Sequence, residues 1–181
     1  MNKKIGRMAQ IAFAIAIIIV CSWTALPSAI PITMQTFAIF AVLGLLGGRD
    51  GTVAVLCYVL IGMLGLPVYS HFKGGIGVVL HDVSGGYIVG FILIAIIYWL
   101  FARIFGRHLT VEIIAMLVGL IACYIIGTAW YVWINVNADK AVEFMETLSV
   151  CVTPFIIPDL AKLAVATALV QKLRKHLRMF K

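Results

Sequence analysis

The last apolar segment of the chain carries two opposite charges close together, in the stretch TPFIIPDLAKL at residues 153–163. Asp159 and Lys162 are three residues apart, so on a helix they share one face and can neutralise each other. Placing either charge near the centre of a membrane helix costs about 2.5–3.5 kcal/mol. Two interpretations are open at this point: a structural ion pair inside a helix bundle, or a site that binds a small ligand with hydrogen-bond donors and acceptors.

The composition predicts that this pair lies in a membrane. The 181 residues are 64% hydrophobic and only 12% charged, whereas about 25% of the residues of a soluble domain are charged. Asp, Glu, Lys and Arg are absent from residues 8–48, 83–102 and 113–138. A helix needs about 20 apolar residues to cross a bilayer, and each of these stretches is long enough. We therefore predict an all-α polytopic membrane protein.

Six transmembrane helices are expected, in a single domain that covers residues 1–181. Their predicted bounds are 8–26, 34–48, 52–66, 84–102, 112–134 and 155–172. Arg49 and Asp50 are expected to form a polar turn between the second and third helices. These two helices span only about 22 Å at 1.5 Å per residue, less than the core thickness of about 30 Å. They must use residues of adjoining loops or lie in locally thinned lipid.

Lys and Arg are distributed unequally between the two sides of this arrangement. Of the 14, eleven fall on the side of the N-terminus, Lys73 and Lys140 fall on the other side, and Lys162 lies within a helix. Because positive charge is favoured on the cytoplasmic side, both termini are expected in the cytoplasm. The net charge of +7 is then a topology signal and predicts no nucleic-acid partner.

The start of the last helix is predicted from its prolines. Pro154 and Pro158 suit the opening of a helix, so Asp159 is expected in the first regular turn, near the outer face. Free N–H groups at a helix start attract anions. The charged pair is therefore expected to be shallow and reachable from outside.

Two further polar clusters belong to the same outer face. Thr33 and Gln35 precede or open the second helix, and the start of the fourth helix carries His81, Asp82, Ser84 and Tyr87. A glycine-rich loop at 67–83 lies between these clusters in the sequence, and glycine lets a backbone approach a ligand closely. Three polar clusters around one rim predict a mostly apolar pocket with a few placed polar groups and a lid.

Motifs for other chemistry are absent from the sequence. It contains no GxxxxGK[ST], HExxH or GxSxG pattern, and its four cysteines form no CxxC pair. We expect no catalytic residues, no metal site and no cofactor. Any ATP-driven task would need a partner protein.

Four short stretches carry a family resemblance. PITMQTF (31–37), GLPVY (65–69), SGGY (84–87) and PDLAK (158–162), in this order and at these separations, resemble the BioY family. That family is the biotin-binding S component of energy-coupling factor (ECF) vitamin transporters. The resemblance is dense over 31–90 and 154–163 and weak in the fifth helix. Val83-Ser84 departs from the family's Pro-Thr pair, and His81-Asp82 is an added polar feature upstream of it.

The resemblance implies a six-helix domain that lies in the plasma membrane of a prokaryote and captures biotin from outside. It implies that Asp159 and Lys162 face the vitamin, where Asp159 accepts a hydrogen bond from a ureido N–H. Lys162 then donates to the ureido oxygen or to the carboxylate of the tail. Tyr87 and apolar residues of 66–80 are expected to pack on the sulfur ring and the tail.

The first helix has two small residues four positions apart, Ala12 and Ala16, near its cytoplasmic end. Pairs of this kind let membrane helices pack closely. The contact lies either inside the bundle or, as the resemblance implies, against an EcfT-type membrane coupling subunit that works with two ATPase subunits.

Two alternatives to a biotin-binding subunit stay open from the sequence. One is an S component for another small vitamin. The other is a small membrane-embedded enzyme that uses Asp82, Asp159 and Lys162 for proton transfer, and it would require turnover of the bound molecule.

Overall fold

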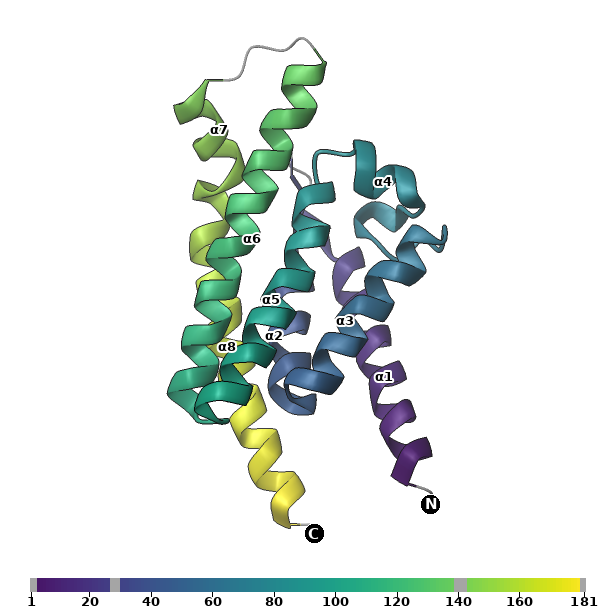
Figure 1. Ribbon diagram of the computed structural model, residues 1–181, viewed down its shortest axis with the longest axis vertical. Coiled ribbons are helices and arrows are strands. Elements are labelled where there is room, and N and C mark those ends of the chain that lie inside the picture. Colours follow the sequence, from purple (N-terminus) through teal and green to yellow (C-terminus); the bar gives the residue numbers. More distant parts are fainter. Residues whose placement is uncertain (1–2, 27–29, 139–142, 180–181) are drawn as a thin grey trace.

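The apolar stretches form long helices in the computed structural model, which describes residues 3–26, 30–138 and 143–179 (Figure 1). The long helices are α1 (Lys3–Trp23), α2 (Gln35–Leu46), α3 (Gly48–Met63), α5 (Gly85–Phe105), α6 (Leu109–Asn137) and α8 (Thr153–Met179). The short ones are η1 (Ser70–Phe72), α4 (Ile76–His81) and α7 (Phe144–Cys151). Strands β1 (Ala25–Leu26) and β2 (Ile32–Thr33) pair antiparallel between α1 and α2. The predicted all-α class is confirmed.

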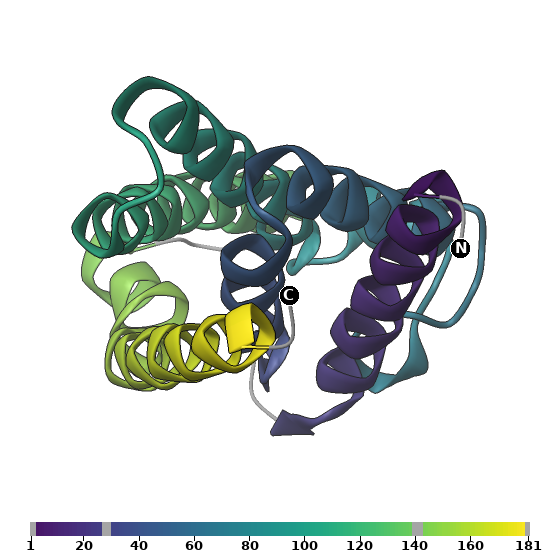
Figure 2. The ribbon, with the colours of Figure 1, turned by 90° about the horizontal axis from the view of Figure 1, so that it is seen from below.

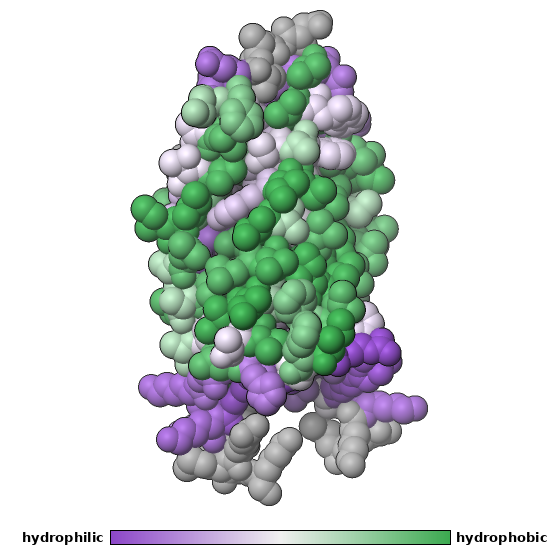
Figure 3. All heavy atoms as spheres, turned by 60° about the vertical axis from the view of Figure 1, so that its left-hand side comes forward, coloured by the Kyte–Doolittle hydropathy of each residue, from purple (hydrophilic) through white to green (hydrophobic). Residues whose placement is uncertain are grey.

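Four helices among the described residues are long and apolar enough to cross a membrane. They are Lys4–Trp23, Gly85–Phe105, Leu109–Asn137 and Phe144–His176, the last of which joins α7 to α8. The apolar helix α2 is shorter, and α3 carries Asp50 in its first turn. On the face shown in Figure 3, hydrophobic residues form a broad band, and hydrophilic residues gather at the end where α1 begins and α8 ends.

Close packing of the long helices depends on glycines between α5 and α6. A Cβ atom at Gly90 would lie 2.5 Å from the sulfur of Cys123, and one at Gly119 would lie 2.9 Å from the Cα of Ile94. Small residues at these positions let the two backbones approach each other. Helix α2 lies between α1 and α8 and packs against both (Figure 2).

The ends of the first three helices differ from the prediction. Helix α1 begins at Lys3 rather than at residue 8. Lys and Arg are good helix formers, so the helix continues through them, although they lie outside the apolar part that faces lipid. The predicted polar turn at Arg49 and Asp50 is wrong: the chain turns at Gly47, with a φ of 86°, and both residues belong to α3. Asp50 lies in the first turn of α3, where the helix dipole favours a carboxylate, and it forms an ion pair with Arg7.

The start of the last helix also differs from the prediction. Helix α8 begins at Thr153 and contains Pro158 in its interior, an arrangement that membrane helices tolerate when neighbouring helices compensate the freed backbone groups. Asp159 therefore lies beyond the first turn. The expectation that free N–H groups of the helix start surround the charged pair is wrong.

The predicted orientation used two basic residues that lie outside the described residues, Lys140 on the outer side and Lys181 on the inner side. The other lysine assigned to the outer side, Lys73, lies between η1 and α4. Figure 1 shows α4 at the end of the bundle opposite to the beginning of α1.

Candidate functional site

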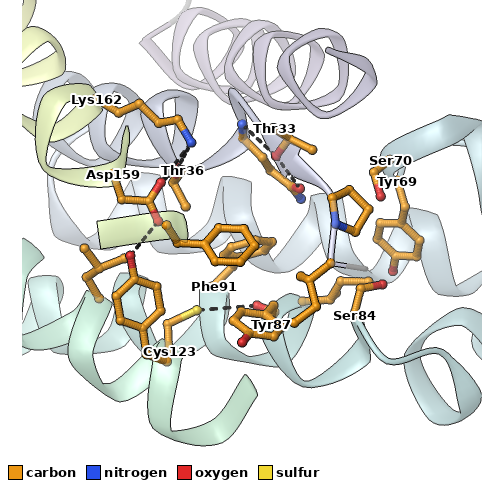
Figure 4. A pocket seen from close by; sticks show the side chains of 17 residues that line it. Thr33, Thr36, Tyr69, Ser70, Ser84, Tyr87, Phe91, Cys123, Asp159 and Lys162 are labelled. Atoms are coloured by element: carbon orange, nitrogen blue, oxygen red, sulfur yellow. Dashed lines mark hydrogen bonds and ion pairs between the residues drawn. The ribbon is translucent and has the colours of Figure 1, made fainter. Parts of the chain in front are cut away.

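A cavity lies where α2 and α5 begin, and Figure 4 shows the side chains that line it. Its empty volume, which includes the open mouth, is about 580 Å³. Helices α2, α5, α6 and α8 and the segments around residues 30–33 and 69–70 contribute to its lining. Its polar side chains include Thr33, Gln35, Thr36, Ser84, Asp159 and Lys162.

The charged pair of α8 forms in this cavity and is joined by two hydroxyl groups. Lys162 Nζ lies 2.8 Å from Asp159 Oδ1, and the hydroxyl of Thr36 donates to the same oxygen over 2.8 Å. Tyr124 donates to Asp159 Oδ2, also over 2.8 Å. Asp159 is only 2% exposed. Donors from α2, α6 and α8 therefore surround the carboxylate and compensate its charge.

Both interpretations of the pair from the sequence therefore apply in part. The ion pair exists, and a cavity lies directly beside it (Figure 4). The pair is more deeply buried than the expected shallow position, since only about a tenth of the Lys162 side chain is exposed. A ligand that reaches it must enter the cavity.

A second polar group is fixed at the start of α2. Gln35 Nε2 donates to the hydroxyl of Tyr58 over 2.6 Å, and that hydroxyl donates to the carbonyl of Val68 over 3.2 Å. Ser22 donates to the same carbonyl. The segment that leads to the cavity-lining residue Tyr69 is thus anchored to α1 and α3, and Gln35 has its amide held in one orientation.

The start of α5 supplies the aromatic wall. The hydroxyl of Tyr87 donates to the carbonyl of Cys151 over 2.8 Å, and its ring stacks on Phe155 with ring centroids 6.1 Å apart. Phe91 lies about one turn further along the same helix and also lines the cavity. These rings form an apolar surface suited to a hydrophobic part of a ligand.

The sequence prediction grouped His81 and Asp82 with the pocket, and the structure places neither of them in the cavity lining. His81 is exposed. Asp82 forms an ion pair with Lys73 at 2.5 Å and accepts hydrogen bonds from the backbone and side chain of Ser84. Burial acts to raise the pKa of Asp82, but the hydrogen bonds from Lys73 and Ser84 outweigh it and lower the pKa. Asp82 therefore connects Lys73, which follows η1, to Ser84 at the start of α5.

Sequence reasoning missed two residues that contact the charged pair. Thr36 adjoins the predicted Gln35 and is a buried polar residue in an otherwise apolar helix, so its type and position were a usable signal. Tyr124 lies within the uncharged stretch 113–138, where nothing in the local sequence separates it from the aromatic residues around it.

Ala12 and Ala16 are exposed on α1, whereas Ala14 and Ile18 on the same helix are buried. The interpretation that Ala12 and Ala16 pack inside the bundle is therefore wrong. A face with small exposed residues is available for lipid or for another protein.

Comparisons with known proteins agree over nearly the whole chain. The model of the BioY family matches residues 1–179. The biotin transporter BioY of Thermotoga maritima is 36% identical over 164 residues, which cover 88% of this chain and 90% of that protein. The biotin transporter BioY2 of Lactococcus lactis is 32% identical over 168 residues, with coverages of 92% and 88%.

A solved structure has the same fold. It is the crystal structure of the S-component for biotin from an ECF-type ABC transporter, with a TM-score of 0.83 and 26% sequence identity. The match covers 96% of this chain and 93% of the other.

Proposed function

This chain belongs to the BioY family, and we propose that it is the S component that captures biotin for an ECF-type transporter. The observation that carries the proposal is the cavity that presents a carboxylate, an ammonium and aromatic rings together. The relatives are transporters, so the protein is a binding subunit and not an enzyme. The alternative is an S component for another small vitamin, and the binding experiment below distinguishes the two.

The chemistry of biotin fits the polar and apolar parts of the cavity. Its ureido ring has two N–H donors and one carbonyl acceptor, which match the acceptor Asp159 and the donor Lys162. We place the ureido ring at this pair, because the 2.8 Å between them brings both within reach of one small ring. Tyr87 and Phe91 then contact the sulfur ring and the tail, and Thr33, Gln35 and Ser84 are left for the remaining polar groups.

We propose six membrane-spanning helices in a single domain, with α2 and α3 as the short ones, in the plasma membrane of a prokaryote. Both termini lie in the cytoplasm in this arrangement. The proposal is supported by the hydrophilic residues that gather at the end where α1 begins and α8 ends (Figure 3), since positively charged ends are retained on the cytoplasmic side.

Energy for transport must come from partners, because the sequence has no nucleotide-binding GxxxxGK[ST] motif. We propose that an EcfT-type coupling subunit and two ATPase subunits supply it. Ala12 and Ala16 are the proposed contact with the coupling subunit, and their exposure on α1 supports this role.

Titration of the purified protein with biotin, followed by calorimetry, tests the proposal. We expect one biotin per chain and recovery of unaltered biotin by mass spectrometry. Riboflavin, thiamine and pantothenate serve as competing ligands. Preferential binding of one of them contradicts biotin as the ligand, and conversion of the bound molecule contradicts a binding subunit.

A further inference from the structure

The two oxygens of Asp159 have different numbers of hydrogen-bond donors. Oδ1 accepts from both Thr36 and Lys162, whereas Oδ2 accepts from Tyr124. An ionised carboxylate has about two acceptor positions on each oxygen. Within the part of the chain that the structure describes, Oδ1 is therefore fully used, and Oδ2 keeps one position for a further donor.

Tyr124 reaches this carboxylate from a helix that the charged pair does not belong to. Asp159 and Lys162 are neighbours on α8, and Thr36 comes from α2. Tyr124 belongs to α6, which packs extensively on α5. Its hydrogen bond therefore fixes the carboxylate plane relative to a different part of the bundle, and the direction of the free position on Oδ2 depends on it.

We propose that Tyr124 is a positioning residue for ligand capture: its hydroxyl directs Oδ2 of Asp159 so that this oxygen accepts one N–H of the ligand. The proposal rests on the function proposed above and adds a definite contact to it. It assigns one ureido N–H of biotin to Oδ2 and reserves Oδ1 for the protein's own donors, Thr36 and Lys162.

The ring of Tyr124 has a role that differs from that of its hydroxyl. The residue lines the ligand cavity and also an apolar groove on the outer side of α6 and α8, together with Ile121, Ile125, Ile156 and Leu160. The ring therefore forms part of the wall between the two spaces, and the hydroxyl carries the contact to Asp159. Replacement by phenylalanine keeps the wall and removes only the positioning contact.

The deciding experiment combines Tyr124→Phe with two biotin analogues, in each of which oxygen replaces one ureido N–H. For the wild-type protein, one analogue should bind at least about 10-fold more weakly than biotin, because it leaves Oδ2 without its donor. Tyr124→Phe should weaken biotin binding about 10-fold and should reduce the difference between biotin and that analogue. Equal losses for all three ligands would mean that Tyr124 is only structural.

Tyr131→Phe is the matched control, since it removes a hydroxyl from the same helix and no hydrogen bond of that hydroxyl is found among the described residues. It should leave all affinities unchanged. If wild-type protein does not bind biotin, the proposed function fails. If it binds biotin and both analogues equally well, the inference about Oδ2 fails even where Tyr124→Phe cannot be purified. Unchanged biotin affinity of a folded Tyr124→Phe protein also overturns it.

Discussion

A buried ion pair usually adds little stability, because the loss of hydration offsets the attraction between the charges. Asp159 and Lys162 are almost fully buried, and the hydroxyl of Thr36 joins them: it donates to Asp159 and accepts from Lys162 over 3.3 Å. This geometry holds both charges in one orientation beside an open space. A ligand with complementary donors and acceptors then meets groups that need no rearrangement, which is the condition for tight binding.

Removal of either charge should therefore weaken biotin binding strongly. Asp159→Asn and Lys162→Met are each expected to raise the dissociation constant about 10- to 100-fold, because a hydrogen bond to a charged group is worth about 1.5–3 kcal/mol. Calorimetric titration measures the effect, and Lys172→Met, an exposed lysine on the same helix, is the control. A variant with wild-type affinity would show that its residue has only a structural role.

The sequence identified the residues whose chemistry is unusual for their surroundings. Asp159 and Lys162 stand out in an apolar segment, and Thr33, Gln35, Ser84 and Tyr87 open helices on the same side; all six line one cavity. Their role in binding stays a prediction. Tyr124 could not be found this way, since its importance comes from the packing of α6 near α8. His81 and Asp82 were included because local sequence does not reveal side-chain direction.

At the scale of helices, a second buried charge cluster holds the bundle at the end away from the cavity. Glu112 at the start of α6 is 3% exposed and accepts from Arg174 of α8 at 2.7 Å and from Tyr98 of α5 at 2.9 Å. Arg107 and Arg174 both donate to the carbonyl of Gly44 in α2. The carboxylate thus connects three helices, α5, α6 and α8, and the two arginines add α2 through its carbonyl. Helices α2 and α8 are joined both here and at the ligand cavity.

Glu112→Gln should destabilise the protein by about 1–3 kcal/mol, because it removes the charged acceptor of the half-buried Arg174. Unfolding in detergent, followed by circular dichroism, measures the change. Glu146→Gln on the exposed face of α7 is the control and should change stability by less than about 0.5 kcal/mol. Equal stability of the two variants would show that Arg107 and Arg174 find other partners in the bundle.

The stability of the loop between α3 and α5 should depend on pH through Asp82, which forms an ion pair with Lys73. The folded protein holds the pKa of Asp82 below its ordinary value of 3.8, so the charged form stabilises the fold at any pH above that value. This contribution is lost as the pH falls through the lowered pKa. The stability difference between wild type and Asp82→Asn should therefore be constant from pH 8 to about pH 5 and should shrink below about pH 4. A difference that persists at pH 2 would contradict the role of the Lys73–Asp82 ion pair.

The helices that consist of long apolar stretches were predictable from the sequence. The short elements, which depend on local backbone geometry, were less so. The six long helices appear in the predicted order, whereas the segment 67–83 contains η1 and α4, which were not expected. Glycines and polar residues interrupt its apolar residues at irregular intervals, so neither helical nor strand periodicity is visible in the sequence. The paired strands β1 and β2 are two residues each, too short for any pattern.

At the scale of the whole molecule, charge distribution predicts the orientation in the membrane. Reporter fusions after residue 181 should be active only as cytoplasmic reporters, and fusions inserted at Lys73 only as periplasmic or external ones. The reason is the larger number of Lys and Arg residues on the side of the termini. A C-terminal fusion that reports from outside would contradict an even number of spans with an inner N-terminus.

Assembly with the coupling subunit should depend on a face of α1 that takes no part in biotin binding. Neither Ala12 nor Ala16 lines the ligand cavity, and both are exposed, so Ala12→Trp should leave biotin affinity within about two-fold of wild type. A large side chain at a close helix contact separates the two helices, so co-purification with the coupling subunit and uptake of labelled biotin should both fall about 10-fold or more. Ile104→Trp, at an exposed position of α5, controls for the added bulk and should assemble normally. If Ala12→Trp assembles and transports as wild type does, the coupling subunit contacts another face, and the small residues of α1 only adjoin lipid.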